Sequence, residues 1–320
     1  MNPNYVFHVL FALPVIRMIN LAFLIKKIDI ALRTLFLLLA FIVFFSACDS
    51  SHQKAAEQAS ASNDSATFQP PWKLGIQLWT FNISTFYDAI DKVDSCGVKY
   101  IEVYPGQKLS KKDTTGFGPA MSQAQRDSVK ALISRRGLTI TSFGVAGADN
   151  MDGWKKLFEF AKEMNIPVIV AEPKNEQWDY VDKMAGEYNI KIAIHDHPKP
   201  AHFWHCDSVL AAIKGHSNIG SCADVGHWAR NGLNPVDCMK ALRGHIMDMH
   251  LKDVTVFNKV NANDTLPGKG VIDFKAVFSE LREQNYTGAV SIEHESNWEH
   301  AVDDVKKIVA FYNEQMEMLK

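Results

Sequence analysis

The sequence carries almost no net charge, and this excludes several classes of function. Its 34 basic and 36 acidic residues give a formal net charge of -2, which creates no field that would recruit nucleic acid or an anionic membrane surface. Nucleic acid is therefore not an expected partner. The chain also lacks a GxGxxG turn, because the segment 144–147 has neither the third glycine nor the spacing. Nucleotide binding accordingly has little support.

Cysteine is scarce and histidine is unevenly placed. None of the five cysteines lies in a CxxC pair or at zinc-finger spacing, and the four after Cys48 are expected to be small buried hydrophobic residues: Cys96, Cys206, Cys222 and Cys238. The sequence does not decide whether any of them form a disulfide. No histidine occurs from residue 53 to 194, whereas ten follow, several of them in the phrases IAIHDHP, SCADVGHW, MDMHLKD and VSIEHE. Histidines beside carboxylates at the ends of apolar runs are typical of a metal site built from several strand ends.

The N-terminus has the pattern of an export signal. Basic residues precede an apolar run at 35–45, whose 11 residues are too few to span a bilayer of about 30 Å. The phrase FSAC ending at Cys48 resembles the lipobox of bacterial lipoproteins, which implies that the Cys48 thiol is lipidated. We expect a signal peptide over 1–47 and a lipid-anchored protein of a bacterial cell envelope, periplasmic or associated with the outer membrane. An N-terminal membrane anchor that stays intact is the alternative.

Residues 48–72 are rich in serine and alanine and have no apolar period, so we expect a flexible tether. The remaining segment, 73–320, has close to the roughly 250 residues of one eight-stranded α/β barrel. Eight short runs rich in β-branched residues alternate there with amphipathic helical segments: KLGIQLWTF, YIEVYP, TITSFGV, PVIVAEP, KIAIHDH, IGSCADV, IMDMHLKD and AVSIEHES. Strict alternation predicts a parallel sheet and favours a single-domain (β/α)8 TIM barrel over an open doubly wound sheet. The long gaps at 104–121 and 253–271 are expected to be loops that cover the site.

In a barrel, the carboxyl ends of all strands face one mouth, where active sites are built. The polar and aromatic residues expected there are Trp79, Glu102, Tyr104, Glu172, His195, His197, Asp224, His227, His250, Lys252, Asp253, Glu293 and Glu295. Because residues two apart share a face of a strand, His195 pairs with His197, His250 with Lys252, and Glu293 with Glu295. Such a set suits one divalent ion, namely Mn²⁺, Zn²⁺, Fe²⁺, Co²⁺ or Mg²⁺, and the sequence does not choose among them.

The phrases DVGHW, HLKD, GKGVIDF and YTGAVSIEHE resemble the xylose-isomerase-like barrel superfamily across residues 73–320. In its epimerase-like members a Glu, an Asp, a His and a second Glu hold one metal ion. The resemblance implies that Asp224, His250 and Glu293 are three of these ligands. The first Glu is missing, since His195 stands at its position. Either His195 is itself a ligand, or Glu172 supplies the carboxylate; we expect Glu172 to bind the metal, with His195 close by.

The resemblance also implies proton abstraction next to a carbonyl. Glu293 is our first candidate for the base, and Glu172, His195 or His197 for the partner acid. His227 matches a histidine that contacts substrate, and Lys252 is a candidate for neutralising a developing oxyanion. Trp79 is a candidate for stacking on a sugar, or else a core-capping aromatic residue. Glu102 and Tyr104 are candidates for substrate contacts.

These residues predict a metal-dependent isomerase or epimerase acting on a small carbohydrate. Because export separates the protein from cytosolic sugar phosphates, we expect an unphosphorylated sugar or sugar derivative. Two alternatives stay open: a lyase or dehydratase that eliminates a group from a keto-glycoside or an inosose, and a sugar-binding lipoprotein without catalysis. The membrane is expected as a partner only through the lipid anchor. The sequence leaves open whether the barrel forms a homo-oligomer.

Overall fold

The computed structural model describes residues 69–319, and the fold confirms the predicted barrel. The expected signal peptide, Cys48 and residues 48–68 of the expected tether lie outside the described residues. Trp72, the last residue of that tether, is buried, and its indole nitrogen donates a hydrogen bond of 2.6 Å to the Tyr312 hydroxyl. Among the described helices, none combines the length and apolar character needed to cross a membrane.

Eight parallel strands close into a barrel in the order β1-β10-β7-β6-β5-β4-β3-β2. The strands are β1 Lys73–Gln77, β2 Tyr100–Val103, β3 Thr139–Ala146, β4 Val168–Ala171, β5 Lys191–His195, β6 Ile219–Asp224, β7 Ile246–Leu251 and β10 Ala289–Ile292. Each corresponds to one of the eight apolar runs of the sequence. Every strand contains at least one isoleucine or valine, because a strand covered on both sides favours β-branched side chains.

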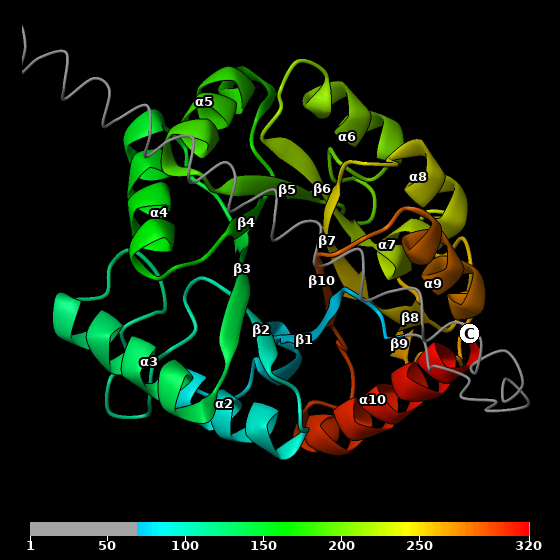
Figure 1. The fold of residues 1–320 in the computed structure, drawn as a ribbon, viewed down its shortest axis with the longest axis horizontal. Coiled ribbons are helices and arrows are strands. Elements are labelled where there is room, and N and C mark those ends of the chain that lie inside the picture. The colour runs from blue at the N-terminus through cyan, green and yellow to red at the C-terminus, as the bar shows by residue number, and fades with distance from the viewer. Residues whose placement is uncertain (1–68, 320) are drawn as a thin grey trace, which may run out of the picture. The chain divides into compact units, whose positions relative to one another are not determined.

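Helices surround the barrel as a ring, as Figure 1 shows. They are α2 Phe86–Ser95, α3 Gln123–Arg136, α4 Met151–Glu163, α5 Trp178–Tyr188, α6 Cys206–Ile213, α7 Val225–Arg230, α8 Pro235–Ala241, α9 Phe274–Glu283 and α10 Ala301–Met318. Gly137 and Asn189 end α3 and α5 in the left-handed conformation, which glycine and asparagine adopt more readily than other residues. Each helix turns an apolar face to the strands, and this packing forms the main core.

Two local features differ from the predicted strands. The first apolar run does not stay extended to its end: Leu78–Phe81 forms a short 3-10 helix, which the Gln77 side chain caps by accepting from the Trp79 amide. The long segment after β7 contains a two-stranded antiparallel hairpin, β8 Asp253–Val254 with β9 Asp264–Thr265. Asp253 stabilises the later part of this segment, because its carboxylate accepts hydrogen bonds from four backbone amides there: Gly268, Gly270, Val271 and Ile272. The 253–271 segment is therefore an ordered structure beside the barrel mouth.

Candidate metal centre at the barrel mouth

Four side chains from consecutive positions around the barrel converge at the carboxyl ends of β5, β6, β7 and β10. They are His195, Asp224, His250 and Glu293, and each offers one donor atom to a common group. His250 Nδ1 lies 3.0 Å from His195 Nε2, 3.6 Å from Asp224 Oδ2 and 3.0 Å from Glu293 Oε2. Metal bonds of about 2.0–2.2 Å in a tetrahedral site place donor atoms about 3.3–3.6 Å apart. The distances in this group, from 3.0 Å to the 3.8 Å between His195 Nε2 and Asp224 Oδ2, lie on both sides of that range, so the four atoms are compatible with one shared divalent ion.

Two buried oxygens of this group, Asp224 Oδ2 and Glu293 Oε2, make no hydrogen bond of standard geometry. The ammonium of Lys252 forms ion pairs with both of them. The other oxygen of Asp224 accepts from the amides of Gly226 and His227 at the start of α7. Asp224 Oδ2 is thus held toward the group. This donor chemistry is what a bound cation would satisfy.

Lys252 supplies positive charge at the edge of the group. Its side chain is completely buried, and Nζ lies 3.2 Å from Asp224 Oδ2, 2.8 Å from Glu293 Oε2 and 2.6 Å from Glu295 Oε1. Burial opposes the charged forms, but the mutual attraction prevails: it raises the pKa of Lys252 and lowers the pKa of Asp224 and Glu293. Gly226 makes room for the lysine stem, since a Cβ there would meet Lys252 Cγ at 2.6 Å. The sequence prediction that His250 and Lys252 share one face is confirmed.

Glu102 lies beneath this group instead of in the cavity. It is fully buried, and its Oε2 accepts a hydrogen bond of 2.9 Å from His250 Nε2. The expectation that Glu102 contacts substrate does not fit this position. Glu102 precedes Tyr104 by two positions, which is about 6.6 Å along a strand. This spacing sets Glu102 one layer deeper in the barrel. Glu102 instead orients the imidazole of a candidate metal ligand.

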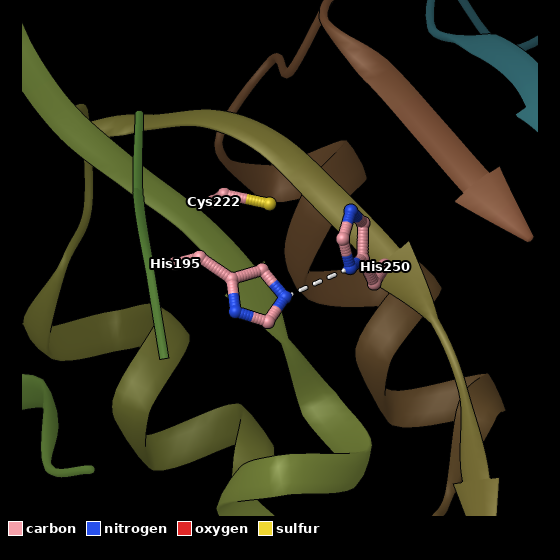
Figure 2. A group of neighbouring side chains, drawn as sticks. All are labelled: His195, Cys222 and His250. Atoms are coloured by element: carbon pink, nitrogen blue, oxygen red, sulfur yellow. Dashed lines mark hydrogen bonds between the residues drawn. The ribbon is translucent and has the colours of Figure 1, made fainter. Parts of the chain in front are cut away.

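Cys222 is the sulfur-bearing neighbour of the same group. Figure 2 shows it on β6 between His195 and His250, and the donor atoms of the three side chains lie within 4.8 Å of one another. Burial raises the pKa of the Cys222 thiol well above its usual value. A neutral thiol is a poor ligand, so the two carboxylates and two imidazoles make the better metal set. Cys222 is buried as the sequence predicted, and so are Cys96, Cys206 and Cys238.

Glu172 does not join the four-donor group. Its carboxylate pairs with His197, and the His197 Nδ1 atom lies 3.4 Å from His195 Nδ1. Burial lowers the pKa of His197, but the hydrogen bond with Glu172 and its charge prevail and raise it. The sequence left two candidates for the fourth metal ligand, His195 and Glu172. The geometry therefore favours His195. His195 turns Nε2 toward the group and Nδ1 toward the Glu172–His197 pair.

His227 follows Asp224 on α7 and faces the same space. Its Nε2 lies 3.6 Å from Asp224 Oδ2, and its Nδ1 lies 2.9 Å from Arg230 Nη1. Arg230 was not among the predicted site residues, although the spacing of three residues in DVGHWAR puts it beside His227 on a helix. Its guanidinium also pairs with Asp264 on the hairpin. Burial first, then the charges of Lys252 and Arg230, lower the pKa of His227 well below its usual value.

A cavity of about 360 Å³ opens above the group. Its lining includes the predicted residues His195, His197, His227, Glu293 and Glu295, together with Gln77, Arg230, Trp79, Tyr104, Pro105 and Val145. The rings of Trp79 and Tyr104 meet edge to face with centroids 5.0 Å apart, Trp79 is 40% exposed, and its indole nitrogen donates to Glu295 Oε2 at 3.3 Å. Trp79 therefore lines the cavity in which its candidate role would be to stack on a sugar. Glu172, Asp224, His250 and Lys252 do not line the cavity.

The fold and these side chains define a class of protein: a (β/α)8 barrel with a candidate metal centre of mixed imidazole and carboxylate ligands at the carboxyl ends of its strands. The chain belongs to the xylose isomerase-like TIM barrel family, whose sequence profile matches residues 90–315. The family resemblance noted in the sequence is thereby confirmed.

Individual relatives agree with this membership. The chain is 27% identical over 242 residues to an inosose isomerase of Halalkalibacterium halodurans, covering 68% of this chain and 85% of that protein. It is 26% identical over 160 residues to an inosose dehydratase of Clostridium beijerinckii, covering 42% of this chain and 53% of that protein. It therefore spans only about half the length of that dehydratase.

Solved structures share the barrel. A crystal structure of a protein from Parabacteroides distasonis has a TM-score of 0.63 and 32% identity, and the match covers 76% of this chain and 99% of that one. The crystal structure of the IOLI protein with a bound zinc atom has a TM-score of 0.64 at 18% identity, covering 78% of this chain and 99% of that one. The second likeness concerns the fold alone.

Proposed function

We propose that this protein is a divalent-metal-dependent isomerase or epimerase that removes a proton next to a carbonyl of an unphosphorylated sugar or sugar derivative. The observation that carries the proposal is the convergence of His195, Asp224, His250 and Glu293 beside a cavity that both polar and aromatic side chains line. Relatives named inosose isomerase and inosose dehydratase support an enzyme that acts on a small sugar-like substrate. The zinc atom in the IOLI protein supports a divalent ion.

A metal ion held by these four residues would stabilise negative charge that develops on a neighbouring substrate oxygen, a contribution of several kcal/mol. Glu293 is the best-placed base, because it lines the cavity and belongs to the group that would hold the metal. The Glu172–His197 pair borders the same cavity through His197, which is placed to hold or return a proton. Such proton transfer contributes about 10²- to 10⁴-fold in rate. Trp79 would support one face of the sugar ring.

Metal analysis and isotope exchange test this proposal. The purified protein should contain one equivalent of a divalent ion per chain. Incubation of the metal-loaded protein with candidate ketoses in deuterated water should introduce deuterium at the carbon next to the carbonyl, because that proton leaves during the reaction. His250→Ala should lose the metal and Glu293→Ala should lose exchange, while both keep the circular dichroism of the folded barrel.

Matched controls exist on the surface. His300 and Glu299 are exposed, so His300→Ala and Glu299→Ala should keep both metal and exchange. Full exchange in His250→Ala or Glu293→Ala would refute this site. A protein that binds sugar but neither holds metal nor exchanges protons would instead be the non-catalytic sugar-binding lipoprotein.

A lyase or dehydratase is the second candidate function, favoured by the similarity to an inosose dehydratase. The same proton abstraction next to a leaving group would expel that group by β-elimination. Incubation with 3-keto-glycosides separates the two reactions: a lyase releases the aglycone, whereas an epimerase returns an intact glycoside with one inverted centre.

The location of the protein is part of the proposal. We propose that it is lipid-anchored through Cys48 in the cell envelope, which rests on the signal pattern and the FSAC phrase. Metabolic labelling with a fatty-acid analogue should modify the wild-type chain but not Cys48→Ser. Equal labelling of both would refute the anchor.

A further inference from the structure

The position of Arg230 determines whether Nδ1 of the His227 imidazole carries a proton. Arg230 Nη1 lies 2.9 Å from His227 Nδ1, which is hydrogen-bond distance. A guanidinium carries only donors and keeps its proton under ordinary conditions. His227 Nδ1 must therefore accept, so it bears no proton. A neutral imidazole then carries its single proton on Nε2.

The two contacts of Nε2 favour different states. Nε2 lies 3.6 Å from Asp224 Oδ2, which accepts, and 3.5 Å from Lys252 Nζ, which donates. The ammonium of Lys252 is also a donor and already lies against three carboxylates. At 3.5 Å it is a weaker influence than the guanidinium at 2.9 Å. The proton on Nε2 thus points between a carboxylate oxygen and the cavity that His227 lines.

Arg230 is itself held by the hairpin of β8 and β9. Its Nε donates to the Ala262 carbonyl at 3.1 Å, and Nη2 pairs with Asp264. The second oxygen of Asp264 accepts from the Glu295 amide at 2.7 Å. A guanidinium fixed at these two points leaves Nη1 little freedom. The hairpin is therefore connected to the imidazole through one arginine.

We infer that Arg230 is a positioning residue that locks His227 as the Nε2–H tautomer, so that His227 is a fixed hydrogen-bond donor to a carbonyl or hydroxyl oxygen of the substrate. In this state His227 does not act as a general base, because Nε2 is already protonated and Nδ1 is occupied by Arg230. The inference rests on the proposed function for the substrate, but the tautomer itself does not. It replaces the looser expectation that His227 takes part in catalysis or binding with one defined role.

Nitrogen NMR of the full chain labelled with ¹⁵N-histidine tests the inference without turnover. Long-range ¹⁵N–¹H correlations distinguish Nδ1 from Nε2, and His227→Gln identifies the resonances of His227. The metal-free protein and the protein loaded with diamagnetic zinc should both show an unprotonated Nδ1 and a protonated Nε2. A proton on Nδ1 in the wild type would overturn the inference, whatever the enzyme's activity.

Arg230 variants test the cause. Arg230→Met should give a measurable population protonated on Nδ1 and should lower activity about 10- to 100-fold, the usual cost of losing an outer partner. Arg230→Lys should restore the wild-type tautomer and part of the activity. Arg135 is exposed, so Arg135→Met is the matched control. An unchanged tautomer in Arg230→Met would refute the role of Arg230. If that variant does not fold, the tautomer measured in the wild-type protein still tests the inference.

Discussion

His250 donates a hydrogen bond from Nε2 to Glu102 Oε2 across 2.9 Å, and both side chains are completely buried. Because the Glu102 oxygen accepts in this bond, the proton is on Nε2, and the other nitrogen of His250 faces His195, Asp224 and Glu293. Glu102 therefore determines which atom of His250 is offered to a metal ion. Partners of this kind fix both the tautomer and the ring orientation of a ligating histidine.

Glu102→Gln should weaken metal binding about 10- to 100-fold. The glutamine carbonyl still accepts from His250, but it lacks the negative charge that strengthens the imidazole as a ligand. Competition with a coloured chelator would measure the dissociation constant for zinc in the wild type and the variant. Glu299→Gln on the surface is the matched control, and an affinity in Glu102→Gln equal to that of the wild type would contradict the role of Glu102.

His195→Glu should change the metal preference of the site. The variant would have three carboxylates and one imidazole, a set that suits Mn²⁺ and Mg²⁺ better than the present two of each. We expect the ratio of manganese affinity to zinc affinity to rise relative to the wild type, as measured by competition titrations with both ions. His300→Glu adds the same charge at an exposed position and should leave the ratio unchanged. A ratio that stays constant or falls in His195→Glu would show that His195 is not a ligand.

The alternation of apolar runs and helical segments predicts the barrel, and the family resemblance predicts three of the four donors from phrases that each lie at one strand end. Each strand end has its own phrase, and side-chain alternation places His250 and Lys252 on one face without knowledge of the rest of the chain. The choice between His195 and Glu172 is different, since both lie at strand ends. That choice depends on the Glu172–His197 contact, which joins side chains from two strands.

The depth of a side chain within the barrel is also beyond local reasoning. Glu102 and Tyr104 share a face of one chain segment, yet only Tyr104 lines the cavity. Tyr104 lies nearer the carboxyl end of the strand and therefore nearer the mouth. Whether Glu102 also reaches the cavity depends on strand tilt and on the side chains around it, which are properties of the closed sheet. Arg230 was not predicted for another reason. Its role depends on contacts with His227 and Asp264, and Asp264 lies on a hairpin that the sequence did not predict.

A pH-dependent contribution to stability is expected outside the metal centre. His216 donates from Nδ1 to the Ala212 carbonyl at 2.6 Å and from Nε2 to Asp179 at 2.9 Å, and these bonds raise its pKa above the ordinary 6.5, with Asp179 as the largest cause. A pKa raised by folding stabilises the fold fully below the unfolded value, and this gain is lost as pH rises through the folded value.

The melting temperature of Asp179→Asn should therefore differ most from that of the wild type below pH 6.5. The difference should shrink as the pH rises above the folded pKa. Any constant remainder would reflect the lost interaction of Asp179 with the N-terminus of α5, where it lies in the first turn. Thermal unfolding over a series of pH values measures this. A difference that widens with increasing pH would contradict the assignment.

Lys252 should be most important when no metal is bound. Lys252→Met leaves Asp224 and Glu293 buried without their shared cation, and breaking a buried ion pair in this way costs about 3–5 kcal/mol. A divalent ion beside the same carboxylates would supply the missing positive charge, and it would no longer be repelled by the ammonium. Added zinc should thus raise the free energy of unfolding more for Lys252→Met than for the wild type, by mass action on a tighter site.

Urea unfolding with and without excess zinc measures both effects. Lys275→Met is the matched control, because Lys275 is exposed on α9, and a surface change of this kind stays within about 0.5 kcal/mol. A Lys252→Met protein as stable as the wild type without metal would mean that the lysine charge does not offset those carboxylates. A variant that is destabilised but gains no more from zinc than the wild type would mean that the ion binds elsewhere. Only a larger gain from zinc fits an ion held by Asp224 and Glu293 beside Lys252.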